Sequence, residues 1–406
     1  MSKIVFVNRY FYPDHSATSQ LLTDLACDLS VMGKEVMVIA GRQLYDNPKA
    51  ALPVVEMVYG VEVRRVRTTT FGRVNLMGRA IDYLAFYISA ILLMIRELRT
   101  GDTLVVKTDP PLLSSFALGV AKLKGARLVN WVQDVFPEVA LALEVKAIPP
   151  AAARFLVWLR NASWRLAWRN IVLSEAMKKY LLGQGVKEST ITVIHNWSDG
   201  KSVFPVQEDE NQLRIEWGLE DKFVVGYSGN LGRAHEFKTI MDAAALMADR
   251  EDIVFLFIGG GAQAEELRLQ ASESGMKNIV FRPYQPREML AVSLSVPDIH
   301  IISLLPSLEG FVVPSKFYGI AAAGRPILYV GDIDAEIPRI LEKESCGYAV
   351  SIGDSGGFVK YIEELSANQS ECRQMGVRSR KMFDRYYDKP IAIGAWVDAI
   401  QSQILE

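Results

Sequence analysis

The sequence lacks several features that would place it in other classes of protein. It has only three cysteines in 406 residues, Cys27, Cys346 and Cys372, and no two of them stand at the spacing of a metal or redox pair, so buried thiols are expected. It has no uncharged stretch of about 18 residues, although half of its residues are hydrophobic and its mean hydropathy is +0.13. A disulfide scaffold and a transmembrane helix are therefore not expected.

No secretion signal is recognisable at the start of the chain. Residues 1–7 carry one charge and no small-residue cleavage site, so they predict a buried first strand and not a signal peptide. We therefore expect a cytoplasmic protein. No repeat of 20 to 50 residues and no low-complexity tract is apparent, which excludes solenoid and fibrous architectures.

The charged residues are distributed unevenly along the chain. Residues 1–200 carry 24 lysines and arginines against 17 acidic residues, a net charge of +7, whereas the rest of the chain carries −9. A basic first half suits an anionic partner, either a membrane surface or a phosphorylated substrate, and ordinary scatter over a solvated surface is the other interpretation. We expect peripheral association with the inner face of the cytoplasmic membrane, and no nucleic acid partner.

Short β-branched runs alternate with helical patterns, which is typical of parallel sheets covered by helices. A first series of expected strands covers residues 4–7, 35–40, 103–107, 128–132, 170–173 and 191–194. A second series covers residues 223–227, 253–258, 278–281, 298–303, 327–330 and 348–350. Residues 198–221 between the two series are polar and acidic, as in a linker, so a boundary is expected near 197–215. The pattern predicts an α/β protein with two successive doubly wound domains.

Two stretches of the first domain combine apolar and basic residues. Residues 84–95 form an apolar run that is too short to span a bilayer, and a core helix is the first interpretation. Residues 154–169 place three tryptophans among four arginines, a mixture suited to a lipid headgroup layer. A helix that packs one face and exposes the other explains the second pattern equally well.

Glycines follow the first expected strand of the second domain. Residues 229–235, Gly-Asn-Leu-Gly-Arg-Ala-His, stand between that strand and a helical pattern. Glycines let a ligand approach the backbone closely, and the start of a helix offers N–H groups and the positive end of the helix dipole. The combination suits a diphosphate, although it matches neither the dinucleotide fingerprint nor the Walker loop, and such turns also occur in proteins that bind nothing.

A second loop at a strand end, residues 303–316, leads into a helix of small residues. Ser315 is a candidate N-cap of that helix, and Lys316 lies in its first turn. A cation in the first turn opposes the helix dipole unless an anion neutralises it. The lysine therefore indicates a phosphate partner, with solvent exposure at small cost as the alternative.

Four more residues that follow expected strands are candidates for the site. His15, in the loop after the first strand, and Asp134, after the strand at residues 128–132, could contact a bound ligand. An aspartate that caps a turn is the other interpretation of Asp134. Tyr284 and Arg287 could border such a ligand, with surface packing as the alternative.

Motifs spread over nearly the whole chain resemble the retaining glycosyltransferases of family 4, which have the GT-B fold. They are Tyr12-Pro13, Asp134-Val135-Phe136-Pro137-Glu138, His195-Asn196-Trp197, residues 229–233, residues 283–288, Glu309-Gly310, Pro314-Ser315-Lys316 and residues 323–326. The chain is most similar to the bacterial branch that includes N-acetyl-fucosamine transferases of O-antigen and capsule biosynthesis. The resemblance implies two Rossmann-like domains facing across a cleft: residues 1–200 on the acceptor side, residues 215–382 for the nucleotide sugar, and residues 383–406 crossing back.

The resemblance also implies roles for single residues. Residues 229–233 correspond to the diphosphate-binding turn, Lys316 to a cation near the donor phosphates, and Glu309 to the first of two glutamates around the donor sugar. The expected catalytic residues are Glu309, Lys316, Asp134 and His15. In such an enzyme His15 could form a hydrogen bond with the acceptor, Asp134 could contact the donor sugar or the acceptor, and Tyr284 and Arg287 could border the nucleotide base. The expected nucleotide-sugar-binding residues are Gly229, Asn230, Gly232, Arg233, His235, Tyr284, Arg287, Gly310, Phe311 and Ser315.

Two departures from the family pattern concern the nucleotide. The second glutamate, which in the family binds the ribose, would fall at Phe317 or Gly319, and neither is acidic. The basic pair of the phosphate turn is replaced by Asn230 and His235. Arg233 and Lys316 therefore become the main candidates for phosphate charge.

The implied reaction moves a sugar from a nucleotide-diphospho sugar, expected to be a UDP-sugar, to a polyprenyl-diphosphate-linked saccharide in exopolysaccharide, capsule or O-antigen assembly. Breaking the sugar–diphosphate bond leaves negative charge on the phosphate, which fixed cations and N–H dipoles stabilise, so we expect a metal-independent site with no required cofactor. The alternatives are a UDP-N-acetylglucosamine 2-epimerase-like enzyme and a non-catalytic sugar-nucleotide-binding protein.

Overall fold

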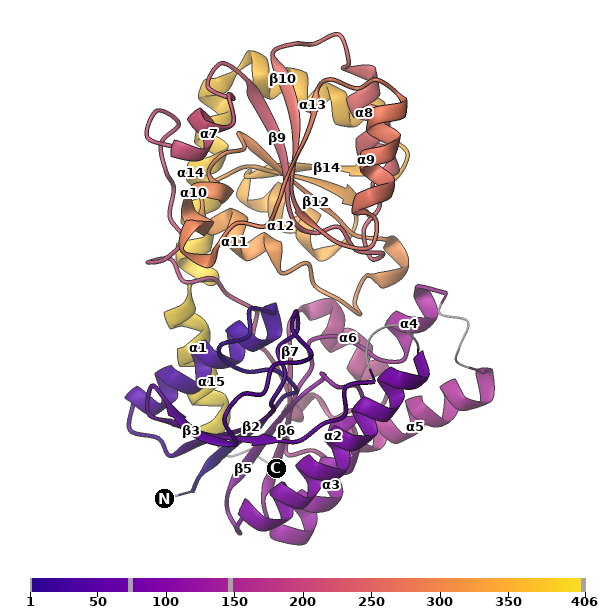
Figure 1. Ribbon diagram of the computed structural model, residues 1–406, viewed down its shortest axis with the longest axis vertical. Helices are drawn as coiled ribbons and strands as arrows, with labels where there is room; N and C mark the ends of the chain where they lie inside the picture. Colours follow the sequence, from indigo (N-terminus) through magenta and orange to yellow (C-terminus); the bar gives the residue numbers. More distant parts are fainter. Residues whose placement is uncertain (1, 72–75, 145–148, 403–406) are drawn as a thin grey trace. The chain divides into compact units, whose positions relative to one another are not determined.

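The computed structural model describes residues 2–71, 76–144 and 149–402 (Figure 1). The chain forms two compact units. Unit 1 comprises Met1–His195, Gly310–Val313 and Ala392–Glu406, and unit 2 comprises Asn196–Glu309 and Pro314–Ile391. The chain therefore leaves unit 1 after His195 and returns to it twice, once briefly at Gly310 and once at Ala392.

Unit 1 is built on an eight-stranded sheet with the strand order β3-β4-β2-β1-β5-β6-β7-β8. Its strands are β1 (Ile4–Val7), β2 (Val36–Gly41), β3 (Val55–Val58), β4 (Val61–Val66), β5 (Thr103–Lys107), β6 (Arg127–Trp131), β7 (Arg169–Val172) and β8 (Ile191–Val193). All neighbouring strands are parallel except β3 and β4, which form an antiparallel pair at one edge.

The expected strands of the first series are confirmed, whereas the β3–β4 pair was not expected. In β4 the apolar residues alternate with Glu62 and Arg64, and most of β3 is not buried. An edge pair needs only one apolar face, so it lacks the continuous apolar run that marks the buried central strands.

The helices of unit 1 are α1 (Ala17–Val31), α2 (Leu76–Glu97), α3 (Leu113–Lys124), α4 (Glu138–Ala142), α5 (Pro150–Leu166), α6 (Glu175–Gly183) and the 3-10 helix η1 (Glu188–Thr190). α3 packs against both α2 and α5, and the Ser115 hydroxyl donates to the Leu159 carbonyl at 3.3 Å. The inner faces of α2 and α3, which include Phe86, Met94 and Ala117, join the buried core with the central strands. Both ambiguous stretches of the sequence are therefore packed helices.

Unit 2 is built on a six-stranded, fully parallel sheet with the order β11-β10-β9-β12-β13-β14. Its strands are β9 (Phe223–Asn230), β10 (Ile253–Gly260), β11 (Ile279–Arg282), β12 (Ile299–Ser303), β13 (Ile327–Gly331) and β14 (Gly347–Ser351). All six were expected, because strands buried on both faces read as unbroken apolar runs such as residues 253–258.

The helices of unit 2 are α7 (Gln212–Glu216), α8 (Lys238–Leu246), α9 (Ala264–Glu273), η2 (Arg287–Met289), α10 (Leu290–Leu294), η3 (Pro306–Leu308), α11 (Lys316–Ala322), α12 (Glu336–Glu344), α13 (Ser355–Ala367) and α14 (Gln369–Tyr386). α15 (Lys389–Gln401) starts in unit 2 and belongs to unit 1 from Ala392 on, where the buried Trp396 ring meets Trp131 at 4.6 Å between centroids. Of the helices described, none is long and apolar enough to cross a membrane.

Because the strands of the unit 2 sheet run in one direction, their carboxyl ends share one edge. The turns that follow β9, β10, β12 and β13 therefore lie along that edge. Ligands of parallel α/β sheets bind at this edge. Most of the candidate site residues of the second domain stand in these turns.

Candidate functional site

The turn after β9 is held in one conformation by its neighbour β10. The Leu231 N–H donates to the Gly260 carbonyl at 2.8 Å, and the Gln263 N–H donates to the Leu231 carbonyl at 3.0 Å. The Gln263 side-chain amide donates to the Gly232 carbonyl at 2.7 Å. The turn is thus preorganised by hydrogen bonds within unit 2.

Glycines allow the ends of β9 and β10 to touch. Gly229 and Gly259 have φ of +126° and +138°, which side chains rarely tolerate. A Cβ on Gly259 would lie 2.2 Å from the Gly229 carbonyl oxygen, and one on Gly261 would lie 2.4 Å from Asn230 Oδ1. No larger residue fits at either position without displacing the turn.

Lys316 places a buried ammonium group beside this turn. Its Nζ lies 3.6 Å from the centroid of the Tyr227 ring, and a Cβ on Gly229 would lie 3.8 Å from its Cε. Among the residues that the structure describes, Nζ is buried and has no hydrogen-bond partner. Burial lowers the pKa of Lys316 well below its usual value. A buried cation without a carboxylate is the feature expected of a site that awaits an anion.

Tyr227 supports Lys316 and was not singled out from the sequence. Its ring is fully buried in β9, and its hydroxyl donates to the Asn230 carbonyl at 2.9 Å. The ring face partly compensates the ammonium by a cation–π contact. In the sequence Tyr227 looks like any aromatic residue of a buried strand, so no local signal marked it.

The two residues that replace the family's basic pair carry no positive charge here. The Asn230 amide folds back over Gly232, whose Cβ would lie 2.8 Å from Asn230 Nδ2. His235 Nδ1 donates to the Ser303 carbonyl. Burial, with a smaller effect of the nearby Lys316, lowers the pKa of His235 to about 3. His235 is therefore neutral at physiological pH, and Lys316 is the buried basic side chain of the turn.

The other candidates of unit 2 border the edge with exposed side chains. Arg233, Ser315 and Arg287 are exposed. The ring of Tyr284 is 59% exposed and lies on the Gly259–Gly260 backbone, and its hydroxyl donates to the Gly260 carbonyl at 3.1 Å. Ser315 is the residue before α11, but it makes no side-chain capping hydrogen bond, so the expected N-cap interaction is absent.

Glu309 follows η3 as a half-buried carboxyl group. Burial raises the pKa of Glu309, and a hydrogen bond from the Glu336 backbone N–H partly offsets this effect. Glu336 is the first residue of α12, so a second carboxylate lies near Glu309. Phe317 is buried and Gly319 lies within α11. Neither of these two positions offers an acidic group.

The start of α8 differs from the expected anion site. The Thr239 N–H donates to Glu236 Oε1 at 2.9 Å, so a side chain of the protein already occupies this helix end. The expectation of free N–H groups there was wrong in this respect. Lys316 and the glycine turn remain as the features that favour a phosphate.

One Asp-x-Asp sequence follows a strand, Asp332-Ile333-Asp334 after β13. Asp332 Oδ1 accepts a hydrogen bond from the Asp334 N–H at 2.9 Å, so this carboxylate closes the turn before α12. Across residues 2–71, 76–144 and 149–402, no group of three or more histidine, cysteine or acidic side chains is arranged to hold a metal ion.

Asp134, in unit 1, lies next to a second acidic residue that the sequence did not single out. Asp134 and Asp109 both follow central strands, and the charge of Lys107 lowers the pKa of each, while Arg9 also lowers that of Asp109. Burial raises the pKa of Asp134, and it raises the pKa of Asp109 to about 6. Asp134 Oδ1 is buried without a partner among the described residues. These carboxyl groups mark the carboxyl-terminal edge of the unit 1 sheet.

Lys107, the last residue of β5, explains how this cluster stays buried. Its Nζ donates to the Thr18 carbonyl at 2.8 Å and lies 3.7 Å from the centroid of the Trp131 ring.

His15 is exposed in the loop before α1, and its carbonyl accepts a hydrogen bond from the Gln20 amide at 2.7 Å. The Ser16 hydroxyl bonds to Asp14 and not to the helix, so it does not cap α1.

Gly310 and Phe311 belong to unit 1 although the residues on either side of 310–313 belong to unit 2. The Phe311 carbonyl accepts a hydrogen bond from the Val135 N–H at 3.0 Å, and its ring meets Tyr180 at 5.0 Å. Val312 forms a β-bridge with Asp134. The segment after Glu309 is thus fixed beside Asp134 in unit 1.

Replacing Asp109 by asparagine is expected to stabilise the protein at neutral pH by about 1 to 3 kcal/mol. The pKa of Asp109 is about 6 in the folded protein and 3.8 as a free side chain, so the wild type loses stability as pH rises between these values. The gain should therefore be absent near pH 4 and complete above pH 6. Urea unfolding at both pH values measures it.

The matched control is Asp252→Asn. A hydrogen bond from Arg250 lowers the pKa of Asp252, so this change should weaken the protein slightly at neutral pH. A larger gain for Asp109→Asn at acidic than at neutral pH would contradict the assignment of a buried, destabilised carboxylate at position 109.

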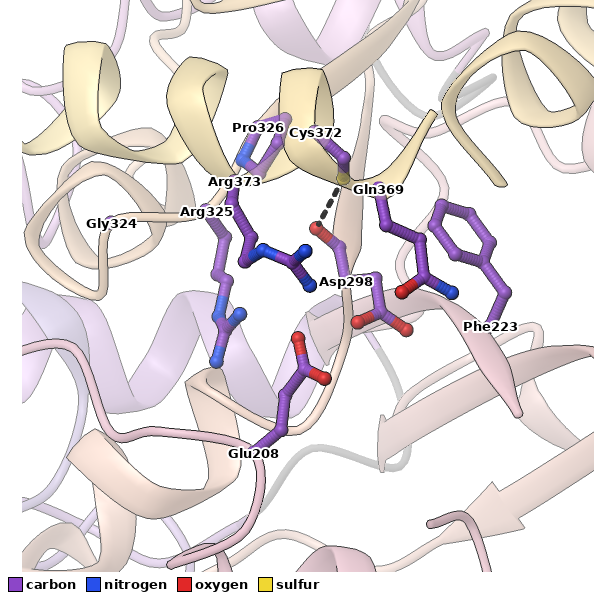
Figure 2. Close-up of a pocket in the computed structure, with 9 residues that line it drawn as sticks. All are labelled: Glu208, Phe223, Asp298, Gly324, Arg325, Pro326, Gln369, Cys372 and Arg373. Atoms are coloured by element: carbon purple, nitrogen blue, oxygen red, sulfur yellow. Dashed lines mark hydrogen bonds between the residues drawn. The ribbon is translucent and has the colours of Figure 1, made fainter. Parts of the chain in front are cut away.

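A small pocket, with a cavity volume of about 20 Å³, lies at the opposite, amino-terminal edge of the unit 2 sheet. Figure 2 shows the residues that line it: Glu208, Phe223, Asp298, Gly324, Arg325, Pro326, Gln369, Cys372 and Arg373. Asp298 accepts hydrogen bonds from Arg214 at 3.1 and 3.2 Å and from the Val224 N–H at 2.7 Å. Arg325 donates to the carbonyls of Val206 and Ser295.

The charged groups of this pocket hold the linker to the sheet. The Arg325 side chain bonds to Val206 near the linker and to Ser295 before β12, so it joins these two segments. Burial raises the pKa of Cys372 to about 12, so its thiol stays protonated beside the Asp298 carbonyl. We therefore assign the pocket a structural role. As expected, Cys346 and Cys372 are buried free thiols, whereas Cys27 is half-buried.

The chain is similar to glycosyltransferases of known sequence and structure. Residues 209–382 match the family of glycosyl transferases group 1. "Probable glycosyltransferase WbjE" of Pseudomonas aeruginosa is 27% identical over 310 residues, 76% of each chain. "O-antigen chain mannosyltransferase C" of Escherichia coli is 26% identical over 160 residues, 37% of this chain and 40% of that one. The crystal structure of Anabaena HepE in complex with UDP and glucose has a TM-score of 0.73 at 14% identity, and the match covers 99% of this chain and 100% of HepE.

These two parallel-sheet units form the GT-B fold, which confirms the expected fold class. The match of residues 209–382 to the group 1 family and the relatives named glycosyltransferases support a transferase enzyme. Relatives of this group take part in bacterial polysaccharide biosynthesis.

Proposed function

We propose that this protein transfers a sugar from a UDP-sugar to a polyprenyl-diphosphate-linked saccharide, with retention at the anomeric carbon and without a metal ion. The proposal includes a place in the assembly of a bacterial O-antigen, capsule or exopolysaccharide at the inner face of the cytoplasmic membrane. The observation that carries it is the buried ammonium of Lys316 beside the glycine turn after β9.

A diphosphate suits this place for electrostatic reasons. An ammonium without a carboxylate partner is costly in a buried position, and an incoming phosphate oxygen removes that cost. The glycines leave backbone exposed where a side chain would otherwise stand between ligand and turn. HepE, a structural neighbour, was crystallised with UDP and glucose, which supports a uridine nucleotide as the donor.

In the proposed reaction the bond between the anomeric carbon and the β-phosphate oxygen breaks, and a bond to the acceptor oxygen forms on the same face of the sugar. The proton of the acceptor hydroxyl passes to the departing phosphate oxygen. Lys316 stabilises the negative charge that develops on this oxygen. Glu309, half-buried after η3, is assigned to the hydroxyl groups of the donor sugar, and the exposed ring of Tyr284 to the uracil.

A lipid-linked acceptor is the part of the proposal that concerns unit 1. Its basic charge suits a diphosphate headgroup at a membrane surface. Asp134 and His15 stay assigned to the acceptor side. The family relative named for an O-antigen chain supports a saccharide acceptor of this kind.

A donor screen by thermal unfolding tests the proposal. UDP-sugars are expected to raise the melting temperature, whereas GDP- and ADP-sugars at equal concentration should have little effect, because a ligand that binds the folded state stabilises it by mass action. The shift should persist in EDTA, because in the proposed site Lys316, and not a divalent ion, stabilises the phosphate charge.

Two results would argue against it. A shift that requires Mg²⁺ and disappears on Asp332→Asn would assign the phosphates to a metal. Conversion of UDP-N-acetylglucosamine to its 2-epimer in the absence of any acceptor would favour the epimerase alternative. Anomeric configuration of the product, read by NMR coupling constants, tests retention.

A further inference from the structure

The outer face of three adjacent helices in unit 1 is apolar. Figure 1 shows α2, α3 and α5 side by side along one flank of unit 1, and α3 packs against the other two. In α2 the outward residues Ile81, Leu84, Ile88, Leu92 and Ile95 are 37–63% exposed. They follow one another at intervals of three or four residues, so they form a single stripe along the helix.

The neighbouring helices extend this stripe. In α3, Phe116 and Leu123 are exposed, and the Phe116 ring meets Tyr87 of α2 at 5.4 Å. In α5, Phe155 and Trp158 are exposed and stack on each other with centroids 5.9 Å apart. Ten exposed apolar residues on adjoining helices exceed the scattered surface residues of ordinary soluble proteins and mark an interaction surface. We call this surface the three-helix face; it consists of Ile81, Leu84, Ile88, Leu92, Ile95, Phe116, Leu123, Phe155, Trp158 and Leu166.

The charges of the three-helix face have one sign. Arg96, Lys122, Arg154 and Arg165 are the exposed charged residues among the described side chains of these helices. Neither of the two carboxylates on the same helices is fully exposed: Asp82 is buried and accepts from Thr69, and Glu97 pairs with Arg64 and lies 3.3 Å from Arg96.

We propose that the three-helix face is where this protein docks on an anionic phospholipid bilayer. It deepens the membrane association that is part of the proposed function. Aliphatic side chains enter the acyl boundary, the Phe155–Trp158 pair lies among the headgroups, and the arginines and lysine meet lipid phosphates. A second copy of the chain fits less well, because an isologous contact would bring the four cationic residues against themselves.

Vesicle flotation of the full chain tests the proposal. The protein should float with vesicles of phosphatidylcholine and phosphatidylglycerol, bind weakly to phosphatidylcholine alone, and dissociate as salt is raised. Leu84→Glu with Leu92→Glu should lower the vesicle partition coefficient at least about tenfold. Trp158→Phe should remove most of the blue shift of tryptophan emission that vesicles induce in the wild type.

The matched control is Leu246→Glu with Leu269→Glu, two leucines of unit 2 that are 66% and 59% exposed on α8 and α9. This pair should bind vesicles like the wild type. Both double variants should keep the donor-induced melting shift, so a failure of docking is distinguishable from a failure of donor binding.

Three outcomes would overturn the proposal. The first is failure of the wild type to float with anionic vesicles, and the second is flotation of the Leu84/Leu92 variant equal to that of the wild type. Alternatively, sedimentation could show a wild-type dimer that this variant converts to a monomer while neither form binds vesicles, which would assign the face to contact between copies.

Discussion

Replacing Lys316 by methionine is expected to abolish the rise in melting temperature that a UDP-sugar causes, and to make the protein without ligand more stable. Methionine keeps an unbranched side chain as far as Cε but removes the ammonium group. Loss of a buried charge pair costs about 3 kcal/mol of binding free energy, which raises the dissociation constant roughly 100-fold. Removal of an unpartnered buried ammonium should add about 1 to 3 kcal/mol to the free energy of unfolding.

The pH dependence of that gain identifies its cause. The pKa of Lys316 is lowered in the folded protein, so at pH values between the lowered pKa and about 10.4 the unfolded chain binds the proton more strongly. Wild-type stability therefore rises with pH in this window. The advantage of Lys316→Met should be largest at low pH and shrink towards pH 10, as urea unfolding at several pH values would reveal.

The matched control for Lys316→Met is Lys238→Met. Lys238 also opens a helix of unit 2, α8, but its side chain is exposed and pairs with Asp242 at 2.5 Å. Its loss should leave the donor-induced shift intact and should not stabilise the protein. An unchanged donor shift in Lys316→Met would remove Lys316 from the site.

Replacing Gly259 by alanine is expected to destabilise the protein by about 3 kcal/mol or more and to weaken donor binding. Its φ of +138° is strained for any side chain, and the new Cβ would lie 2.2 Å from the Gly229 carbonyl oxygen. Because the contacted oxygen belongs to the backbone of Gly229, the turn after β9 must move. Chemical unfolding measures the loss of stability, and the donor-induced melting shift measures the displaced turn.

Gly275→Ala separates the two effects. Gly275 also has a positive φ, +63°, but nothing lies within 4 Å of its added Cβ. This control should lose only about 1 to 2 kcal/mol and keep its donor affinity. Equal losses in the two variants would mean that strain alone, and not the contact between Gly259 and Gly229, maintains the turn.

Much of the fold was predictable from the sequence because the central strands are buried on both faces. Residues 253–258 are apolar without interruption, and such a run between helical patterns indicates a parallel strand. The β3–β4 pair escaped prediction because an edge pair shows only a weak alternation. The exposed stripe of α2 also escaped, since an apolar run of this length reads first as core.

The candidate site was predictable where chemistry depends on a residue type and its place after a strand. Lys316 and the glycines of residues 229–232 were found in this way. Tyr227, Asp109 and Glu336 were not, because their importance comes from neighbours distant in the chain. The neutral state of His235 likewise depends on burial, which lowers its pKa more than the hydrogen bond to the Ser303 carbonyl, 68 residues further on, raises it.

By itself the sequence determined that this protein has two α/β domains and that glycines and a lysine stand after strands of the second. Local periodicity and composition carry that information, because they reflect which faces of an element are buried. The tertiary structure alone decided that the Lys316 amino group is buried against Tyr227 with no hydrogen-bond partner in the part of the chain that the structure describes, and that α2, α3 and α5 join their apolar outer faces. Burial and adjacency arise from packing between distant segments, and a linear pattern does not encode them.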